Sequence, residues 1–323
     1  MKKIVVITTG GTIAMKYDSA TDGLQPALGG DDLTAAVPAL SNIARLEVIE
    51  FANVPSGHMT PFMMLELAKL VAKEAERPEV AGFVITHGTD TLEETAYFLS
   101  ITLATTKPVC ITGAMRGASD TGCDGPANLL AAVRTACEED AINRGVLVVF
   151  ADEIHLAENV VKSHTTSCHA FTSPDYGAIG HVDVDRITFF GPSVKPAALQ
   201  TTIVVEPVYL LEIFTGMDEG LFQFMVDNKV AGVVIAAFGC GNVPPAVQKG
   251  IALLRKQDIP VVLTSRVCTG RVAPIYSYEG GGQILAGLGV IWAGTLTAAK
   301  ARLKLMVLLA NGVKGSDLQM YFK

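Results

Sequence analysis

Short apolar runs rich in Val and Ile alternate with segments of helical character through the first half of this 323-residue chain. The alternation is typical of βαβ units, in which right-handed crossovers build a parallel sheet covered by helices. We expect strands at residues 3–8, 45–52, 80–86, 108–112 and 145–150. We expect helices between them at residues 31–36, 60–75, 90–103 and 125–138. The sequence therefore predicts an α/β fold with a larger parallel sheet in its first part.

The second half repeats this pattern on a smaller scale. Residues 152–190 hold short β-like pieces broken by Gly and Pro, which predict a hairpin or an extended arm. Three further apolar strands and a C-terminal helix are expected at residues 208–214, 230–238, 259–265 and 297–309. We predict an N-terminal α/β domain, a proline-containing linker and a smaller C-terminal α/β domain, at residues 1–190, 191–207 and 208–323.

Composition excludes several classes of protein. Half of the residues are hydrophobic and the net charge of −7 is spread without long runs of one sign. A nucleic acid or an anionic membrane requires a clustered basic surface, so neither is an expected partner. The six cysteines lack any CxxC spacing and are expected to be mostly buried, reduced thiols. The chain enters its first strand directly after Lys3 and has no apolar run of membrane-spanning length, so we expect a cytoplasmic protein.

The loops that follow the first four strands are the natural place for a site, because ligands of parallel sheets bind beyond the carboxyl ends of the strands. These loops are TGGT, NVPSGHMT, THGTDT and GAMRGASDTGCDGP, at residues 9–12, 53–60, 86–91 and 113–126. They are rich in hydroxyls and glycine and poor in cations. Neither GxxxxGK[ST] nor GxGxxG follows the first strand, and GCGN at residues 239–242 is only a partial match. A phosphate-binding turn is therefore disfavoured.

Two threonines in these loops, Thr12 and Thr89, are candidate nucleophiles. A threonine hydroxyl needs a base or a charged neighbour to lose its proton. Asp90 follows Thr89 directly, and Lys162 follows the fifth strand and can reach the same cleft, so the three residues form a candidate proton relay. Asp90 is also expected to cap the helix that begins there. Threonines after strands more often stabilise turns or cap helices, and the residues alone favour that structural interpretation.

Histidine and cysteine offer weaker alternatives. His164 and His169 are five residues apart, one more than the helical spacing of a metal-binding pair. His87 is expected to be a hydrogen-bonded neighbour of its turn, and no Cys–His pair indicates a thiol nucleophile. We therefore expect no metal and no cofactor.

Two segments, TTGGTIA at residues 8–14 and VITHGTDTLEETAYFL at residues 84–99, resemble the two signature segments of the bacterial asparaginase/glutaminase family. The similarity continues through GAMR, DGPANL, NRGVLVVF, Lys162, TSRVCTG and AGTLTAAKARL, and so covers nearly the whole chain. The resemblance implies a flavodoxin-like larger domain and a Rossmann-like smaller one.

The resemblance also implies an activity, the hydrolysis of L-asparagine to L-aspartate through a threonyl acyl-enzyme, with ammonia leaving first and water releasing the acid. Thr12 matches the primary nucleophile, while Thr89, Asp90 and Lys162 match the second essential threonine and its charged partners. The division of labour between the two threonines stays open. Alternatives are the same chemistry on L-glutamine, D-asparagine or another amino-acid amide, or a non-catalytic Asp/Asn sensor.

Substrate-binding residues follow from the same resemblance. Ser56 matches a residue that holds the substrate α-carboxylate, and Asp90 also matches the residue that binds the α-ammonium. Backbone amides of Gly11 and of Gly88–Thr89 would suit an oxyanion hole. The carbonyl of Ala114 matches the position that receives the leaving nitrogen. Members of the family are usually homotetramers of intimate dimers, in which the C-terminal domain completes the neighbour's site, and Asn242 matches one such residue.

Three departures from the family pattern bear on substrate choice. The tyrosine that normally closes over the site is absent around residues 25–26, and Tyr17 is a candidate to supply its hydroxyl. Gly57 and His58 replace the usual polar pair, and Gly57 leaves room for a larger or differently placed substrate. Glu279 is the nearest candidate for the partner-subunit glutamate that binds the α-ammonium.

Overall fold

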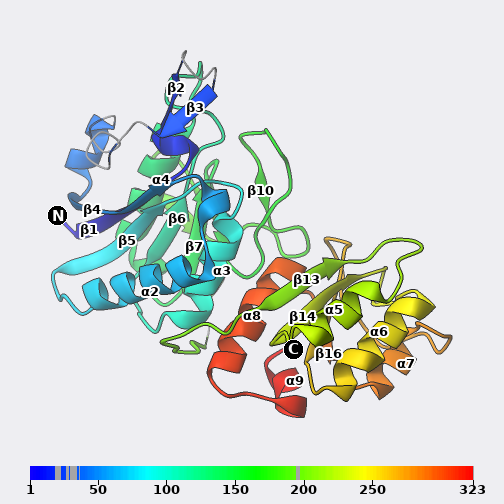
Figure 1. Cartoon of the computed structure of the whole chain (residues 1–323). Helices are drawn as coiled ribbons and strands as arrows, with labels where there is room; N and C mark the ends of the chain where they lie inside the picture. Colours follow the sequence, from blue (N-terminus) through cyan, green and yellow to red (C-terminus); the bar gives the residue numbers. More distant parts are fainter. Residues whose placement is uncertain (19–22, 27–28, 30–34, 36, 194–196, 323) are drawn as a thin grey trace. The chain divides into compact units, whose positions relative to one another are not determined.

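The computed structural model describes residues 1–18, 23–26, 29, 35, 37–193 and 197–322 (Figure 1). The chain divides into two units, Met1–Gln200 and Thr201–Lys323, each with its own sheet. The division falls within residues 191–207, which the sequence predicts as a linker. A membrane span needs a longer apolar helix than any in the described ranges.

Five parallel strands form the centre of the first unit and confirm all five strand predictions. They are β1 (Lys3–Gly10), β4 (Arg45–Val54), β5 (Val80–Thr86), β6 (Val109–Thr112) and β7 (Val146–Phe150). Their order in the sheet is β4-β1-β5-β6-β7, the flavodoxin-like order in which the second strand lies outside the first. The order reverses between β1 and β5, so the loops after these two strands flank the switch point where ligands of such sheets bind.

Helices cover both faces of this sheet. They are α2 (Pro61–Ala75), α3 (Leu92–Thr102) and α4 (Gly125–Cys137), with the short helices η2 (Pro38–Asn42) and η4 (Glu139–Ala141). Leu129 and Val133 of α4 belong to one buried cluster with Ile4 and Val6 of β1. α2 and α3 pack on the other face (Figure 1). The predicted helix at 31–36 lies, apart from residue 35, outside the described residues.

The start of α3 corrects one prediction. The residue that precedes the helix is Thr91, and the Thr91 hydroxyl donates to the carbonyl of Ser56 at 2.8 Å. The carboxylate of Asp90 binds Lys162 instead of capping the helix. The predicted Asp90 cap is therefore wrong, because the lysine offers this carboxylate a charged partner that the helix amides cannot match.

Residues 152–190 form three strands of the large sheet as well as a separate hairpin. β8 (Glu153–Leu156), β11 (Gly180–Val182) and β12 (Ile187–Phe189) extend the sheet antiparallel beyond β7 and bury Ile154 and Val182 in its core. The predicted hairpin corresponds to β9 (Val161–Lys162) and β10 (Phe171–Thr172), which pair only with each other among the described strands. A second hairpin, β2 (Met15–Asp18) and β3 (Gly23–Pro26), follows η1 (Thr12–Ala14) and was not predicted.

The second unit is a four-stranded parallel sheet with helices. Its strands are β13 (Val208–Glu212), β14 (Gly232–Ala237), β15 (Val261–Ser265) and β16 (Ile291–Trp292), in that order. Its helices are α5 (Gly220–Asp227), α6 (Pro245–Lys256), α7 (Gly282–Gly287), α8 (Ala298–Ala310), η5 (Gly315–Asp317) and α9 (Leu318–Tyr321). The predicted strands and the C-terminal helix are confirmed, and so is the α/β class of both units.

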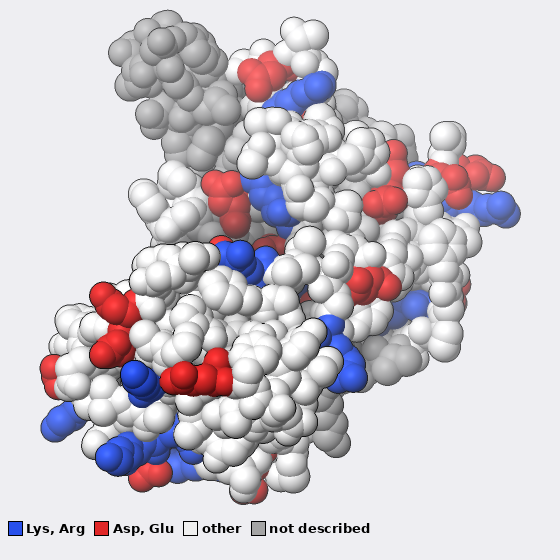
Figure 2. Space-filling view, turned by 90° about the vertical axis from the view of Figure 1, so that its right-hand side faces the viewer, with Lys and Arg blue, Asp and Glu red and all other residues white. Residues whose placement is uncertain are grey.

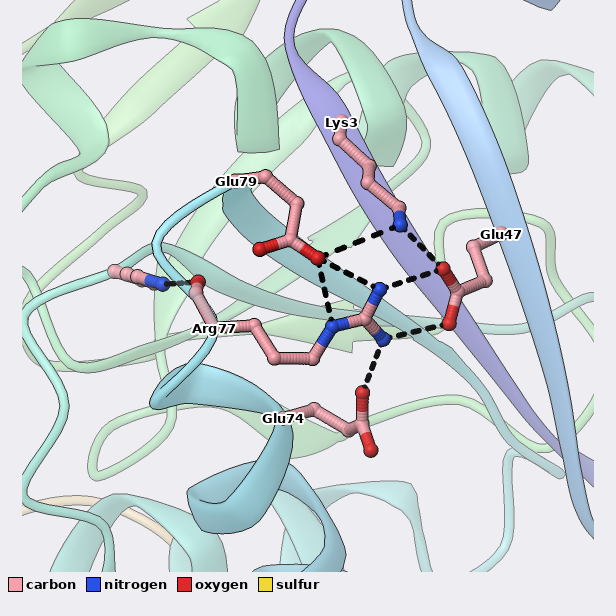
Figure 3. A network of polar contacts seen from close by, with 6 residues as sticks. Lys3, Glu47, Glu74, Arg77 and Glu79 are labelled. Atoms are coloured by element: carbon pink, nitrogen blue, oxygen red, sulfur yellow. Dashed lines mark hydrogen bonds and ion pairs between the residues drawn. The ribbon is translucent and has the colours of Figure 1, made fainter.

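An ion-pair network closes the amino ends of β1, β4 and β5 (Figure 3). The Arg77 guanidinium binds both carboxylate oxygens of Glu47, at 2.7 and 2.9 Å, and also Glu74 and Glu79. Lys3 pairs with Glu47 at 2.5 Å. Hydrogen bonds from Arg77, and then from Lys3, lower the pKa of Glu47 to about 2. The network, which we call the Arg77 network, ties β1 and β4 to the turn between α2 and β5.

On the face shown in Figure 2, Lys and Arg lie singly or in small groups among Asp and Glu. All six cysteines are free thiols. Only Cys110 is fully buried, while Cys268 is exposed and the other four are half-buried, so the expectation of mostly buried thiols is wrong.

Candidate active site

Three loops meet at the switch point of the large sheet. Gly11, after β1, lies so close to Gly88, after β5, that a Cβ on Gly11 would stand 2.3 Å from the Cα and N atoms of Gly88. A Cβ on Gly88 would stand 2.7 Å from the Cβ of Ser56, which follows β4. Gly11 also has a φ of +83°, a left-handed conformation that favours glycine. Glycine at 11 and 88 is thus required for the loops carrying Thr12, Ser56 and Thr89 to converge.

Thr12 begins the short helix η1, and its side chain is half-buried. The amide of the preceding Gly11 donates to the carbonyl of Val54 at 3.2 Å. The amide of Gly11 is therefore occupied by the backbone beside β1, and the predicted oxyanion-hole role of this amide is not supported by the structure.

The charged centre of the site is Lys162, delivered by β9. Its ammonium donates to Oγ1 of Thr89 at 2.9 Å and to Oδ1 of Asp90 at 2.7 Å. Thr89 is buried, whereas the Asp90 side chain is 76 % exposed and the Lys162 side chain is 16 % exposed. A buried hydroxyl that accepts a hydrogen bond from an ammonium is better able to carry negative charge, since the cation stabilises the oxygen as it loses its proton. The structure therefore brings together the three residues of the predicted relay, which we call the Lys162 cluster.

An open hollow of about 340 Å³ lies against this cluster. It is lined by Asp90, Glu93, Lys162, Ser163, His164 and Thr165. Glu93 and His164 were not predicted as site residues. Glu93 accepts the backbone N–H of Lys162 at 2.8 Å, and His164 Nδ1 accepts the amides of Thr166 and Ser167. The only sequence signal for Glu93 is its position in the first turn of the helix after THGTD.

His87 supports the turn between β5 and α3, as predicted. It is buried, and desolvation lowers its pKa to about 4, so the ring is neutral at pH 7. Nδ1 lies 2.8 Å from the carbonyl of Gly88 and Nε2 lies 2.9 Å from the hydroxyl of Thr95. A carbonyl can only accept, so Nδ1 carries the proton and Nε2 accepts from Thr95. This arrangement holds the Gly88 carbonyl in place directly before Thr89.

The remaining predicted residues of the first unit lie around the same loops. Ser56 is buried at the start of η3 (Ser56–His58), and Gly57 is exposed, so that a Cβ added there would meet no atom within 4 Å. Ala114 is buried, and its loop is held by Asp124, which accepts the amides of Met115 and Arg116. The backbone of Tyr17 lies in β2 beside Leu24, but its side chain lies outside the described part of the structure.

Asn242 and Glu279 belong to the second unit, and their loops are joined by hydrogen bonds. The amide of Val243 donates to the carbonyl of Gly280 at 2.9 Å, and the amide of Gly282 donates to Oδ1 of Asn242 at 3.3 Å. Asn242 is half-buried after β14, while Glu279 is exposed. The loops that carry these two residues therefore lie side by side in that unit.

Comparison with known proteins identifies the family of both parts of the chain. Residues 3–195 match the family described as "Asparaginase, N-terminal", and residues 207–322 match the "Glutaminase/Asparaginase C-terminal domain". A "Probable L-asparaginase" of Deinococcus radiodurans is 38 % identical over all of this chain and 97 % of its own length. A "Probable L-asparaginase periplasmic" of Haemophilus influenzae is 33 % identical over all of this chain and 93 % of its own.

A solved structure gives the same result for the fold. The crystal structure of a "Probable Cytoplasmic L-asparaginase" from Campylobacter jejuni is similar to this chain with a TM-score of 0.89 and 33 % identity. The similarity covers 100 % of this chain and 99 % of the other. With both family domains present in order and relatives matched along more than nine tenths of their length, the chain belongs to the asparaginase family.

Proposed function

We propose that this protein hydrolyses L-asparagine to L-aspartate and ammonia. The observation that carries the proposal is the contact of the Lys162 ammonium with Thr89 and Asp90, beside the point where the loop of Thr12 meets the loop of Thr89. Relatives that match the chain over its full length are named L-asparaginases, which supports asparagine as the substrate.

The proposed reaction has two halves. In the first, the Thr12 hydroxyl oxygen attacks the side-chain amide carbon, and its proton passes to the leaving nitrogen with help from the Lys162 cluster. The C–N bond breaks, ammonia leaves, and an ester links Thr12 to the aspartyl group. In the second half, water attacks the ester carbon, the bond to Thr12 breaks, and Thr12 regains its proton. Thr89 is the alternative nucleophile, because the Lys162 contact activates its hydroxyl directly.

The same loops supply candidate substrate contacts. The Asp90 side chain is mostly exposed and lines the hollow. Its Oδ1 contacts Lys162, and its Oδ2 is proposed to bind the α-ammonium. Ser56 is proposed to bind the α-carboxylate, and the carbonyl of Ala114 to receive the leaving nitrogen. The amides of Gly88 and Thr89 are proposed to stabilise the oxyanion. Tyr17 is proposed to supply the hydroxyl that closes over the bound substrate.

The proposed assembly is a homotetramer of intimate dimers acting in the cytoplasm. Asn242 and Glu279 are proposed to complete the site of the neighbouring subunit, and the hydrogen bonds between their loops support a common role. Mixing Thr12→Ala subunits with Glu279→Ala subunits tests this directly. If sites are shared, each mixed pair regains one intact site and activity returns, whereas unshared sites stay inactive in every mixture.

Ammonia release from a panel of L-asparagine, D-asparagine, L-glutamine and D-glutamine tests the substrate. We expect the highest kcat/KM for L-asparagine and its loss in Thr12→Ala and in Thr89→Val. Binding of aspartate or asparagine without any turnover would instead indicate a sensor. A second candidate, an amide larger than asparagine, is favoured by the open space around Gly57. A panel of amides and lactams tests this alternative. A higher kcat/KM for one of them than for L-asparagine would establish it.

A further inference from the structure

We propose that Glu93 positions the catalytic lysine. The carboxylate of Glu93 holds the main chain of Lys162, and thereby fixes where the ammonium meets Thr89 and Asp90. This inference rests on the proposed function, since it assigns Glu93 a role in the same reaction, but its structural part is testable without any substrate.

Lys162 needs such support because its strand is short and makes few hydrogen bonds to other strands. β9 contains only Val161 and Lys162, and among the described strands it pairs with β10 alone. The partner strand is equally short, Phe171–Thr172. A two-stranded hairpin is marginally stable in isolation, so contacts outside the hairpin must fix its position.

Glu93 provides this contact from a rigid element. Its Oε2 accepts the Lys162 N–H at 2.8 Å across 69 residues of sequence. Glu93 lies in the first turn of α3, a helix in which nine residues are buried, from Leu92 to Thr102. A carboxylate in the first turn of a helix is also stabilised by the helix dipole. The main chain of Lys162 is therefore attached to the helix that follows Thr89 and Asp90.

Lys162 is consequently held at two points by one short segment. Its amide is bound by Glu93, and its ammonium contacts Thr89 and Asp90. The two attachments fix the distance between the lysine backbone and the reacting hydroxyl. Small displacements of a catalytic group are costly, about 100-fold for a misplacement of roughly 1 Å. Removal of the Glu93 attachment is therefore expected to lower turnover although Glu93 need not touch the substrate.

Three variants separate positioning from charge. Glu93→Ala removes the acceptor, Glu93→Gln keeps an oxygen that accepts the Lys162 amide but removes the charge, and Glu94→Gln removes an equal charge from the same helical turn. We expect kcat for L-asparagine to fall about 10- to 100-fold in Glu93→Ala, with a smaller change in KM. Glu93→Gln and Glu94→Gln should remain within about threefold of the wild type. An equal loss in Glu93→Gln and Glu93→Ala would overturn the positioning role.

Hydrogen exchange at the Lys162 amide tests the Glu93 contact without any substrate. In Glu93→Ala this amide should exchange at least about tenfold faster, with protection in β1 and β5 unchanged, and Glu93→Gln should retain protection. Unchanged exchange at Lys162 in Glu93→Ala overturns the proposal. If the protein proves inactive on L-asparagine, the proposed function fails while the exchange result still decides whether Glu93 holds Lys162. Should Glu93→Ala not fold, loss of the Lys162 protection in folded Glu93→Gln is the contradicting result.

Discussion

Two cationic clusters lie at opposite ends of the same parallel strands, and they differ in what their cation contacts. At the amino ends, Arg77 is surrounded by three glutamates, and Glu47 is shared with Lys3 (Figure 3). At the carboxyl ends, the cation of the Lys162 cluster contacts a neutral threonine and one largely exposed aspartate beside an open hollow. The Arg77 network satisfies its charges internally, which suits a structural role. The Lys162 cluster leaves hydrogen-bonding capacity for a ligand.

The largest expected effect comes from replacing the cation of the Lys162 cluster with an uncharged side chain of similar length. Lys162→Met should lower kcat for L-asparagine by about 10²- to 10⁴-fold, the range of general acid–base catalysis. Its melting temperature should change little, since the remaining Asp90 carboxylate is exposed. Steady-state kinetics and thermal unfolding of the same preparation measure both effects. A large fall in melting temperature with kcat retained would make the Lys162 cluster structural.

The next effect concerns the contact that joins the loops. Gly11→Ala should lower the free energy of unfolding by about 3 kcal/mol or more, because it combines a positive φ with a Cβ 2.3 Å from the Gly88 backbone. Gly57→Ala is the matched control in the neighbouring loop, where a Cβ meets nothing within 4 Å, and it should stay within about 0.5 kcal/mol. Urea unfolding measures both. Equal stabilities of the two variants would contradict the close approach of the loops.

As the pH falls, the stability contribution of His87, at the carboxyl end of the sheet, should be lost before that of the Arg77 network. Burial lowers the pKa of His87 from its usual 6.5 to about 4, so the folded state resists the proton that the unfolded chain accepts. Its contribution to stability is complete above pH 6.5 and is lost as the pH falls toward 4, by on the order of 3 kcal/mol. His155 is buried with a lowered pKa and acts in the same direction, so the comparison is with His87→Gln. That variant should show a smaller pH slope between 6.5 and 4 in urea unfolding; an identical slope would exclude His87 as the cause.

The Arg77 network should respond at lower pH and with no effect on chemistry. The pKa of Glu47 is lowered from 4.5 to about 2, so its contribution is present above pH 4.5 and is lost as the pH falls through 2. Arg77→Met and Glu47→Gln should lower the melting temperature at pH 7 while leaving kcat within about twofold. Glu47→Gln should also flatten the decline of stability between pH 4.5 and 2. A tenfold fall in kcat in either variant would contradict the separation of the two ends.

The sequence predicted the central strands and helices better than the contacts between residues that are far apart in the chain. The five central strands, α2 to α4 and the place of Thr89 and Asp90 follow from βαβ alternation, because parallel strands bring their carboxyl ends to one edge. The approach of Lys162 to them does not, because the antiparallel β8 lies between β7 and the short strand β9. The helix cap at Asp90 was wrong because a lysine distant in sequence competes for the carboxylate. The Glu93 contact was missed for the same reason, since its partner lies 69 residues away in a two-residue strand.

Sheet extension by β8, β11 and β12 was equally hard to predict. These strands are three or four residues long, and their apolar residues are too few to distinguish an added edge from a free hairpin. Similarly, the sequence does not show that the amide of Gly11 donates to Val54, because this contact follows a register shift between β1 and β4. Local patterns indicate element type, whereas such partners are set by tertiary contacts.

The most direct test of the account is ammonia release from L-asparagine by the wild type, Lys162→Met and Arg77→Met, measured side by side at a temperature where all three are folded. The account predicts turnover in the wild type and in Arg77→Met, and a loss of at least about 100-fold in Lys162→Met. Absence of ammonia release by the wild type, or equal turnover in Lys162→Met and Arg77→Met, would contradict it.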